Sequence, residues 1–203
     1  MAKGYLVLFA FLWFCINRFM RTRGQTLQAA YRSQIQPFEP YLQFAVTLTL
    51  KQNAKIATPY PTGLGSYKRW ERLDDEKTAS TIRYFTALLR KQLFGNHCKH
   101  RNKAAWATPL ALYTVEGRRT NKRRHIHAAI GNVPAAKVEH FSDIVDSAWQ
   151  QCDFADRQTC IKPISSAAGW LHYITKEIGY TDDDCLAITS ASIPPFIQQS
   201  ICT

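Results

Sequence analysis

The run RRHIHAAIG, residues 123–131, places two histidines one residue apart at the start of an apolar stretch. If this run is a β-strand, successive side chains point to opposite faces, so His125 and His127 share one face while Ile126 lies on the other. The preceding apolar run, ATPLALYTVEG, ends in a carboxylate, Glu116. A hairpin that pairs residue 116 with 125, and 114 with 127, brings this carboxylate beside both imidazoles, whereas a slip of one residue moves it to the opposite face. The sequence leaves this register open.

Two imidazoles and a carboxylate on one rigid surface form a three-ligand site with open coordination positions. Such a set suits Mg²⁺, Mn²⁺ or a related divalent ion that acts on a phosphate group. We therefore take Glu116, His125 and His127 as candidate metal ligands. The competing interpretation is the polar edge of an ordinary buried strand, because a lone H-x-H pattern is weak evidence for a metal.

A second chemical candidate lies in GWLHYITKEIGY, residues 169–180. Tyr173 and Lys176 are three residues apart, so they are neighbours on a helix surface, and both lie away from the apolar stripe. A tyrosine beside a cation can attack a phosphate, because the cation stabilises phenolate and the developing negative charge. The alternative is a boundary tyrosine with a solvated lysine. The stripe that we expect to be buried consists of Trp170, Leu171, Ile174 and Ile178.

The formal net charge of +11 over 203 residues favours a polyanionic partner, either nucleic acid or an anionic membrane surface. Positive charge concentrates in the connection between the two hairpin strands. It also occurs in residues 53–73, which we expect to be a long loop that carries aromatic and basic side chains. A surface loop with local packing is an equally acceptable interpretation of 53–73. The candidate DNA-binding residues are Arg118, Arg119, Lys122, Arg123, Arg124, Lys68 and Arg69.

Hydrophobic periodicity predicts the elements that position these groups. Strict alternation indicates strands, and apolar residues at helical spacing indicate amphipathic helices. The polar lead-in at 24–41 contains Pro37 and Pro40, so we expect no helix there. The resulting order predicts an α+β fold with a predominantly antiparallel sheet and helices packed on one side. The expected elements are strand 42–52, helix 78–94, strand 107–117, strand 124–131, helix 137–152, strand 158–164 and helix 167–180.

The first 19 residues differ from the rest of the chain, because they contain the apolar run YLVLFAFLWFCI. This run is shorter than the roughly 20 residues that span a bilayer, and no small-residue cleavage site follows it. It can be a short membrane anchor, an uncleaved signal, upstream sequence read through from an early start codon, or a buried N-terminal helix. We favour the third interpretation, with Met20 as the native start and residues 20–203 as a single domain.

The six cysteines form no C-x-x-C pair and no regular spacing. They support neither a zinc ribbon nor a disulfide framework, which favours a reducing compartment. We therefore expect a cytoplasmic protein for which a membrane partner is not needed.

Taken together, these motifs resemble those of the HUH endonucleases, named for a His-hydrophobe-His motif, and specifically the single-tyrosine replication-initiator or Rep branch. FAVTLTL is similar to the opening strand motif of that family, HIH to its metal motif, and YITK to its Y-x-x-K motif. The order of the motifs is also that of the Rep branch. The resemblance covers roughly residues 42–180, which would form the core of the domain.

The resemblance implies a ferredoxin-like palm with a central antiparallel sheet. It implies a divalent metal ion, Mg²⁺ or Mn²⁺, held by Glu116, His125 and His127, and Tyr173 as the nucleophile on single-stranded DNA. Attack would leave a 5′-phosphotyrosine and a free 3′-OH, and Lys176 would help to place the ion or support charge at the phosphate. The implied activity is that of a metal-dependent single-stranded DNA endonuclease and strand transferase that starts rolling-circle replication of a plasmid or similar mobile element.

We expect the partners to be single-stranded or hairpin origin DNA together with the host's helicase and polymerase, since the chain ends too soon after residue 180 for a helicase domain. A single-tyrosine insertion-sequence transposase is the nearest alternative, but that group usually has glutamine where Lys176 stands. A non-catalytic basic nucleic-acid-binding module is an alternative of another class. A small membrane-tethered protein is a third, if the N-terminal run is genuine.

Overall fold

The computed structural model describes residues 23–201 except for 61–62, 101, 104, 181, 184 and 188–189. The apolar run within residues 1–19 and the proposed start at Met20 lie outside the described residues. Within the part of the chain that is described, no helix is long and apolar enough to cross a membrane.

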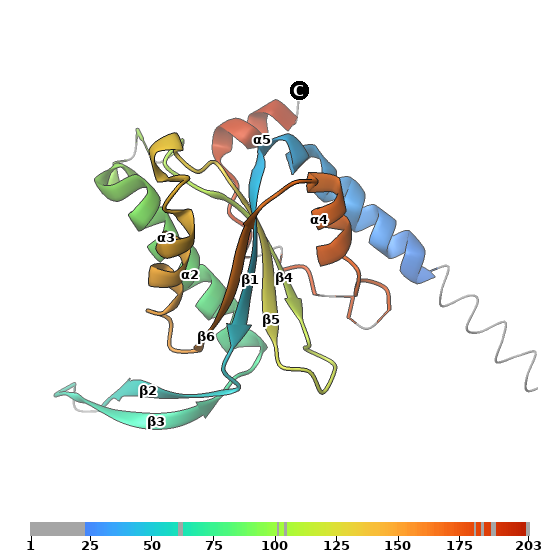
Figure 1. Cartoon of the computed structure of the whole chain (residues 1–203). Coiled ribbons are helices and arrows are strands. Elements are labelled where there is room, and N and C mark those ends of the chain that lie inside the picture. The colour runs from blue at the N-terminus through green and yellow to red at the C-terminus, as the bar shows by residue number, and fades with distance from the viewer. Residues whose placement is uncertain are drawn as a thin grey trace, which may run out of the picture.

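A four-stranded antiparallel sheet lies at the centre of the fold (Figure 1). Its strands and the two helices that connect them are β1 (Leu42–Leu50), α2 (Asp75–Phe94), β4 (Leu110–Glu116), β5 (His125–Gly131), α3 (Phe141–Trp149) and β6 (Ala155–Pro163). The strands lie in the order β4-β5-β1-β6, so β1 is an inner strand although it comes first in the chain. This β-α-β-β-α-β succession with β1 beside β5 is a ferredoxin-like arrangement. The predicted α+β class with an antiparallel sheet is confirmed.

Helices α2 and α3 cover one face of the sheet and enclose the larger hydrophobic core. Strand β5 contributes Ile126, Ala128 and Ile130 to this core, each at most 1% exposed. From the helices, Phe85 and Trp149 pack edge to face with ring centroids 5.6 Å apart. Ile126 therefore faces the core while its two neighbours face away, as strand alternation predicts.

The opposite face of the sheet is covered as well, which corrects the prediction of helices on one side only. Leu110, Leu112 and Ala129 form the sheet side of a second, smaller core. Every residue of β4 except Glu116 is buried, so its sequence reads as a continuous apolar run and gives no alternation to follow. The elements that cover this face include the 3-10 helix η1 (Gln36–Tyr41), α4 (Ala167–Ile174) and α5 (Pro195–Ile201).

The polar lead-in also differs from the prediction. Residues 23–35 form a helix where the prolines predicted none. Pro37 and Pro40 instead lie in η1, which begins where that helix ends. Pro37 is tolerated at the start of η1, because the N–H that it lacks has no intrahelical partner there, and Pro40 lies further inside this short segment.

Residues 53–73, predicted to be a loop, form a two-stranded antiparallel ribbon of β2 (Asn53–Pro59) and β3 (Ser66–Arg72). All residues of β3 except Glu71 are exposed. Polar side chains therefore occupy both faces, and no apolar alternation marks the strands in the sequence.

Helix α4 carries the predicted nucleophile and is shorter than the predicted helix 167–180. The side chain of Ser166 caps its start by accepting a hydrogen bond from the N–H of Gly169 at 3.1 Å. After Ile174 the chain leaves the helix, and the hydroxyl of Thr175 donates to the carbonyl of Leu171 at 2.8 Å. Tyr173 thus lies in the last turn of the helix, and the residues after it lie in a turn.

Replacing Ile126 by alanine should leave a cavity in the larger core, because this side chain is 1% exposed on an inner strand. We expect the free energy of unfolding, measured by equilibrium urea denaturation, to fall by about 2–5 kcal/mol. The control variant Val138→Ala, at a position that is 39% exposed, should change it by less than about 0.5 kcal/mol. Equal losses in the two variants would contradict the placement of Ile126 in the core.

Candidate active site

The hairpin of β4 and β5 has the register that places its carboxylate beside the histidines. The Cα partners are Glu116 with His125 and Thr114 with His127. Of the two registers that the sequence leaves open, the structure therefore has the one that brings Glu116 beside the histidines. On the other side of β5, Thr47 of β1 is the partner of His127. Because directly paired residues share a face, side chains from both neighbouring strands flank the His127 ring.

Glu116 accepts the hydrogen bonds that join these groups. Its Oε2 accepts from Nε2 of His127 at 2.8 Å and from Nζ of Lys176 at 2.9 Å, and Nζ of Lys122 lies 3.6 Å from the other carboxylate oxygen. Burial raises the pKa of this carboxyl, but the hydrogen bonds from Lys176 and His127 outweigh burial and lower its pKa to about 2. The carboxylate is therefore ionised at neutral pH and acts only as an acceptor.

His127 is 6% exposed, and both of its ring nitrogens have a partner. Burial lowers its pKa below 6.5 despite the neighbouring Glu116, so the ring is neutral at neutral pH. Since the carboxylate only accepts, Nε2 carries the ring proton and donates it to Glu116. Nδ1, 3.0 Å from the Thr47 hydroxyl, then accepts a hydrogen bond from that hydroxyl. Thr47 and Glu116 together fix the orientation of the ring.

Tyr173 and Lys176 lie against these groups from the end of α4. Nζ of Lys176 stands 3.9 Å from the centroid of the Tyr173 ring, and the ring centroids of Tyr173 and His127 are 5.3 Å apart. Trp170 stacks on Tyr173 with centroids 5.2 Å apart, and its Nε1–H donates to the carbonyl of Ala128 at 3.1 Å. Tyr173 nevertheless remains 42% exposed, so a substrate in solvent can reach it.

The Lys176 ammonium supplies a fixed positive charge beside the phenol ring. Burial lowers its pKa, but hydrogen bonds with Glu116 and Tyr173 outweigh burial, so its pKa is raised above 10.5. Lys176 is therefore charged at neutral pH. Burial and the nearby Glu116 charge both raise the pKa of Glu177, in contrast to the lowered pKa of Glu116. Negative charge that appears near Tyr173 is thus met by Lys176.

The donor atoms present fit a small divalent ion in part. Nε2 of His127 and Oε2 of Glu116 are 2.8 Å apart. Two neighbouring ligands of an octahedral ion with bonds of about 2.1 Å lie about 3.0 Å apart. His125 pairs with Glu116 in the sheet and is partly exposed on the same face. Among the described residues, however, no three His, Cys, Asp or Glu side chains are grouped as a metal site, so only two of the three predicted ligands are in contact.

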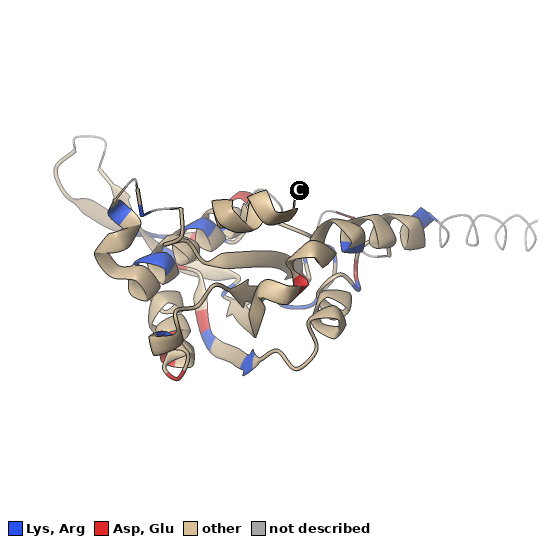
Figure 2. Ribbon diagram, turned by 90° about the horizontal axis from the view of Figure 1, so that it is seen from above, with Lys and Arg blue, Asp and Glu red and all other residues tan. Residues whose placement is uncertain are grey.

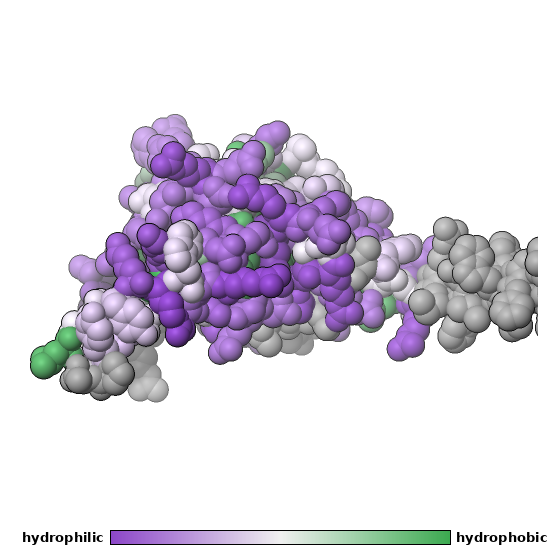
Figure 3. Space-filling view, turned by 90° about the horizontal axis from the view of Figure 1, so that it is seen from below, coloured by the Kyte–Doolittle hydropathy of each residue, from purple (hydrophilic) through white to green (hydrophobic). Residues whose placement is uncertain are grey.

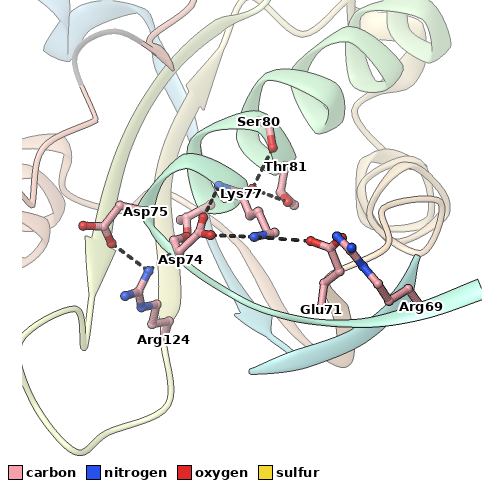
Figure 4. Close-up of polar contacts among 9 residues, drawn as sticks. Arg69, Glu71, Asp74, Asp75, Lys77, Ser80, Thr81 and Arg124 are labelled. Atoms are coloured by element: carbon pink, nitrogen blue, oxygen red, sulfur yellow. Dashed lines mark hydrogen bonds and ion pairs between the residues drawn. The ribbon is translucent and has the colours of Figure 1, made fainter. Parts of the chain in front are cut away.

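The basic connection between β4 and β5 divides into two groups. Arg118 and Arg124 both reach Asp75 at the start of α2, each with an N···O distance of 2.8 Å, and their side chains are only 19% and 16% exposed. Figure 4 shows the contact of Arg124 with Asp75. These two arginines tie the connection to the helix. The other three predicted DNA-binding residues of the connection have side chains between 59% and 67% exposed: Arg119, Lys122 and Arg123.

The remaining predicted DNA-binding residues, Lys68 and Arg69, lie on β3 and not within the site. Arg69 pairs with Glu71 at 2.6 Å, whereas Lys68 is exposed on the other face of the ribbon. Basic residues therefore occur on several elements around the molecule rather than on one helix (Figure 2).

Two residues of the site were not identified from the sequence. Thr47 lies on the polar side of the alternating run FAVTLTL, but only the pairing of β1 with β5 reveals its contact with His127. Trp170, predicted to be core, packs on the second core and also lies against the rings of Tyr173 and His127. The spacing of three residues between Trp170 and Tyr173 could have indicated this contact, because residues three apart are neighbours on a helix surface.

Comparisons with protein-family models, with curated proteins and with solved structures found no match to this chain. We therefore infer function from the site itself. Its geometry brings together Glu116 of β4, His127 of β5, and Tyr173 and Lys176 from the end of α4.

The depressed pKa values predict that the fold loses stability in acid. Below about pH 6.5 the unfolded chain takes up a proton on His127 that the folded chain resists. Glu116 takes up a proton near 4.5 when unfolded but near pH 2 when folded. The free energy of unfolding should therefore be highest above pH 6.5 and should decline as the pH falls, with the Glu116 contribution lost between 4.5 and about 2.

Urea denaturation from neutral pH down to pH 3 checks this expectation. Glu116→Gln should start from a lower stability and show a shallower decline below pH 4.5, because an amide does not titrate. The control Glu139→Gln, at an exposed position, should follow the unmodified protein. A decline in Glu116→Gln as steep as in the unmodified protein would show that this carboxylate is not the titrating group.

Proposed function

We propose that this protein is a metal-dependent single-stranded DNA endonuclease and strand transferase that starts rolling-circle replication of a plasmid or similar mobile element in the cytoplasm. One observation carries the proposal. An exposed tyrosine, Tyr173, lies beside a largely buried set of hydrogen-bonded charged and polar groups, Glu116, His127 and Lys176. A tyrosine held beside a fixed cation suits attack on a phosphodiester.

In the proposed step, the hydroxyl oxygen of Tyr173 attacks the phosphorus of a phosphodiester in single-stranded DNA. A bond forms between Oη and phosphorus, and the bond between phosphorus and the 3′ oxygen breaks. The phenol loses its proton and the departing 3′ oxygen gains one, so the products are a 5′-phosphotyrosine and a free 3′-OH. Attack by a 3′-OH on the phosphotyrosine reverses the step and joins two strands.

The neighbouring side chains support this step by position and charge. Lys176, held by Glu116 at 2.9 Å and placed 3.9 Å from the Tyr173 ring centroid, offsets negative charge on the phenolate and on the attacked phosphate. Trp170 stacks on Tyr173 and restricts the positions that the ring can adopt. The free 3′-OH can prime synthesis, so the host's polymerase and helicase are the proposed partners.

Glu116, His125 and His127 would hold the divalent ion, Mg²⁺ or Mn²⁺. When bound, such an ion supplies positive charge that polarises the scissile phosphate. For this purpose Nε2 of His127 must be unprotonated. The Thr47 hydroxyl accepts as well as donates, so it supports the Nδ1–H tautomer of His127 that leaves Nε2 free.

Two alternatives make different predictions. An insertion-sequence transposase would use the same attack by Tyr173, but on the ends of a transposable element rather than on a replication origin. A non-catalytic nucleic-acid-binding module would need only the exposed cations and would form no covalent product.

Incubation of the protein with Mn²⁺ and single-stranded DNA tiled from its own replicon should give a covalent protein–DNA adduct on a denaturing gel. Tyr173→Phe should abolish the adduct, because it removes the attacking oxygen. The double variant His125→Ala with His127→Ala should also abolish it. Tyr180→Phe is the matched control, since Tyr180 is exposed and follows the site closely in sequence, and it should leave the adduct unchanged. An adduct that survives Tyr173→Phe would refute the proposed nucleophile.

Removing the three exposed cations of the β4–β5 connection should weaken binding to single-stranded DNA. In Arg119→Gln, Lys122→Gln and Arg123→Gln combined, the slope of log K against log salt should flatten by about 2, which is 0.7 for each lost phosphate contact. Fluorescence anisotropy with a labelled oligonucleotide at several salt concentrations measures this slope. The control removes three exposed lysines at the other end of the sheet, Lys91, Lys99 and Lys137. An unchanged slope would mean that the connection does not contact phosphate.

A further inference from the structure

The ribbon of β2 and β3 projects away from the layers that pack on the central sheet (Figure 1). Its cross-strand pairs run from Asn53 with Arg72 at the base to Pro59 with Ser66 near the far end. Seven residues at about 3.4 Å each make each strand about 24 Å long. This length matches about seven base pairs of a DNA duplex.

One face of the ribbon is anchored to the body of the protein. Ala54 is buried, and Ile56 packs against the larger core. On the same face, Glu71 contacts Arg69 at 2.6 Å and Lys77 of α2 at 3.3 Å (Figure 4). These contacts fix the direction in which the other face of the ribbon points.

The other face is exposed and basic, and we call it the outer face. Trp70 is 66% exposed, and the Lys55 ammonium lies 5.2 Å from the centroid of its ring. The outer face thus offers three cations, Lys55, Lys68 and Arg72, together with one aromatic ring. Strand alternation places on it Asn53, Lys55, Ala57, Pro59, Ser66, Lys68, Trp70 and Arg72, none of which is acidic.

The base of the ribbon lies at the same end of the sheet as the β4–β5 connection and His125. The N–H of Leu50 at the end of β1 donates to the carbonyl of Arg124 at 3.1 Å, one residue before His125. The ribbon begins three residues after Leu50, and the β4–β5 connection projects from the same end of the sheet (Figure 1). Seen from that end, the surface is mostly hydrophilic (Figure 3).

We propose that the outer face of the ribbon binds double-stranded DNA, in the form of the stem that adjoins the strand attacked by Tyr173. A two-stranded ribbon fits the major groove, which is about 12 Å wide, and cations on its surface meet the phosphates along the groove. This inference rests on the proposed function only in placing the stem beside the strand that Tyr173 attacks. Binding of duplex by the ribbon is a separate property of this chain.

A duplex fits the outer face better than a single strand does. Single strands are usually bound by several aromatic rings on which successive bases stack. The outer face has one such ring, Trp70, and the exposed Tyr67 lies on the other face of the ribbon. Three cations around one ring instead suit the phosphates of a duplex.

Fluorescence anisotropy with the full chain tests the proposal without any nicking step. The probes are a labelled duplex of two helical turns and an oligo-thymidine strand with the same number of nucleotides. In Lys55→Gln, Lys68→Gln and Arg72→Gln combined, duplex binding at about 0.1 M salt should weaken at least about tenfold, and the salt slope should flatten by about 2.7. Binding of oligo-thymidine should weaken by less than about threefold. The Lys91, Lys99 and Lys137 variant, with each lysine changed to glutamine, should bind duplex like the unmodified protein.

The result is informative whether or not Tyr173 forms an adduct, because neither probe needs to be cut. Unchanged duplex binding in the ribbon variant, or an equal loss in the control variant, would overturn the proposal. So would a loss of oligo-thymidine binding as large as the loss of duplex binding, which would assign the ribbon to single strands. Far-UV circular dichroism and the urea midpoint of both variants confirm that each one is folded before its binding is compared.

Discussion

One carboxylate oxygen, Oε2 of Glu116, accepts hydrogen bonds from both His127 and Lys176, and the arrangement of the site depends on this shared contact. A carboxylate taken out of water is stable as an anion only where donors replace its hydration. Here one donor belongs to β5 and the other to the turn that follows α4. The same oxygen therefore joins the sheet to the helix that carries Tyr173. Loss of either donor would leave the largely buried carboxylate with less compensation, and loss of Lys176 would also remove this contact between the sheet and the end of α4.

The central sheet makes this contact possible because both of its faces are covered. On one face, Ile126 and its neighbours on the core side fix β5 against α2 and α3. On the other, α4 packs over Ala129 and Leu112, and His127 is buried close to the edge of that second core. The Thr47 hydroxyl hydrogen-bonds with Nδ1 of His127, the ring nitrogen that does not contact Glu116. A rigid imidazole near an exposed tyrosine is the result, and rigidity of this kind is what a site for phosphate chemistry requires.

Much of the fold followed from local patterns. Alternation in FAVTLTL and HIHAAIG predicted β1 and β5, and helical spacing predicted α2 and α3. The pairing of Glu116 with His125 was one of two possible registers, and β4, which is buried on both faces of the sheet, gave no alternation that could choose between them. The contacts of Thr47 and Trp170 could not be predicted, since they depend on which strands and helices lie side by side. The ribbon was missed because its exposed strands carry polar residues on both faces, and the helix over 23–35 because prolines beyond its end were taken to exclude it.

Mass spectrometry of the trapped protein–DNA product would show whether Tyr173 becomes covalently joined to DNA. Trypsin should release residues 158–176 as one peptide, because proline follows Lys162, and Tyr173 is the only tyrosine in that peptide. After nuclease trimming, this peptide should carry the mass of a 5′-phosphonucleotide on Tyr173. A nucleotide found on another residue, such as Tyr180, or a product that carries none, would contradict it.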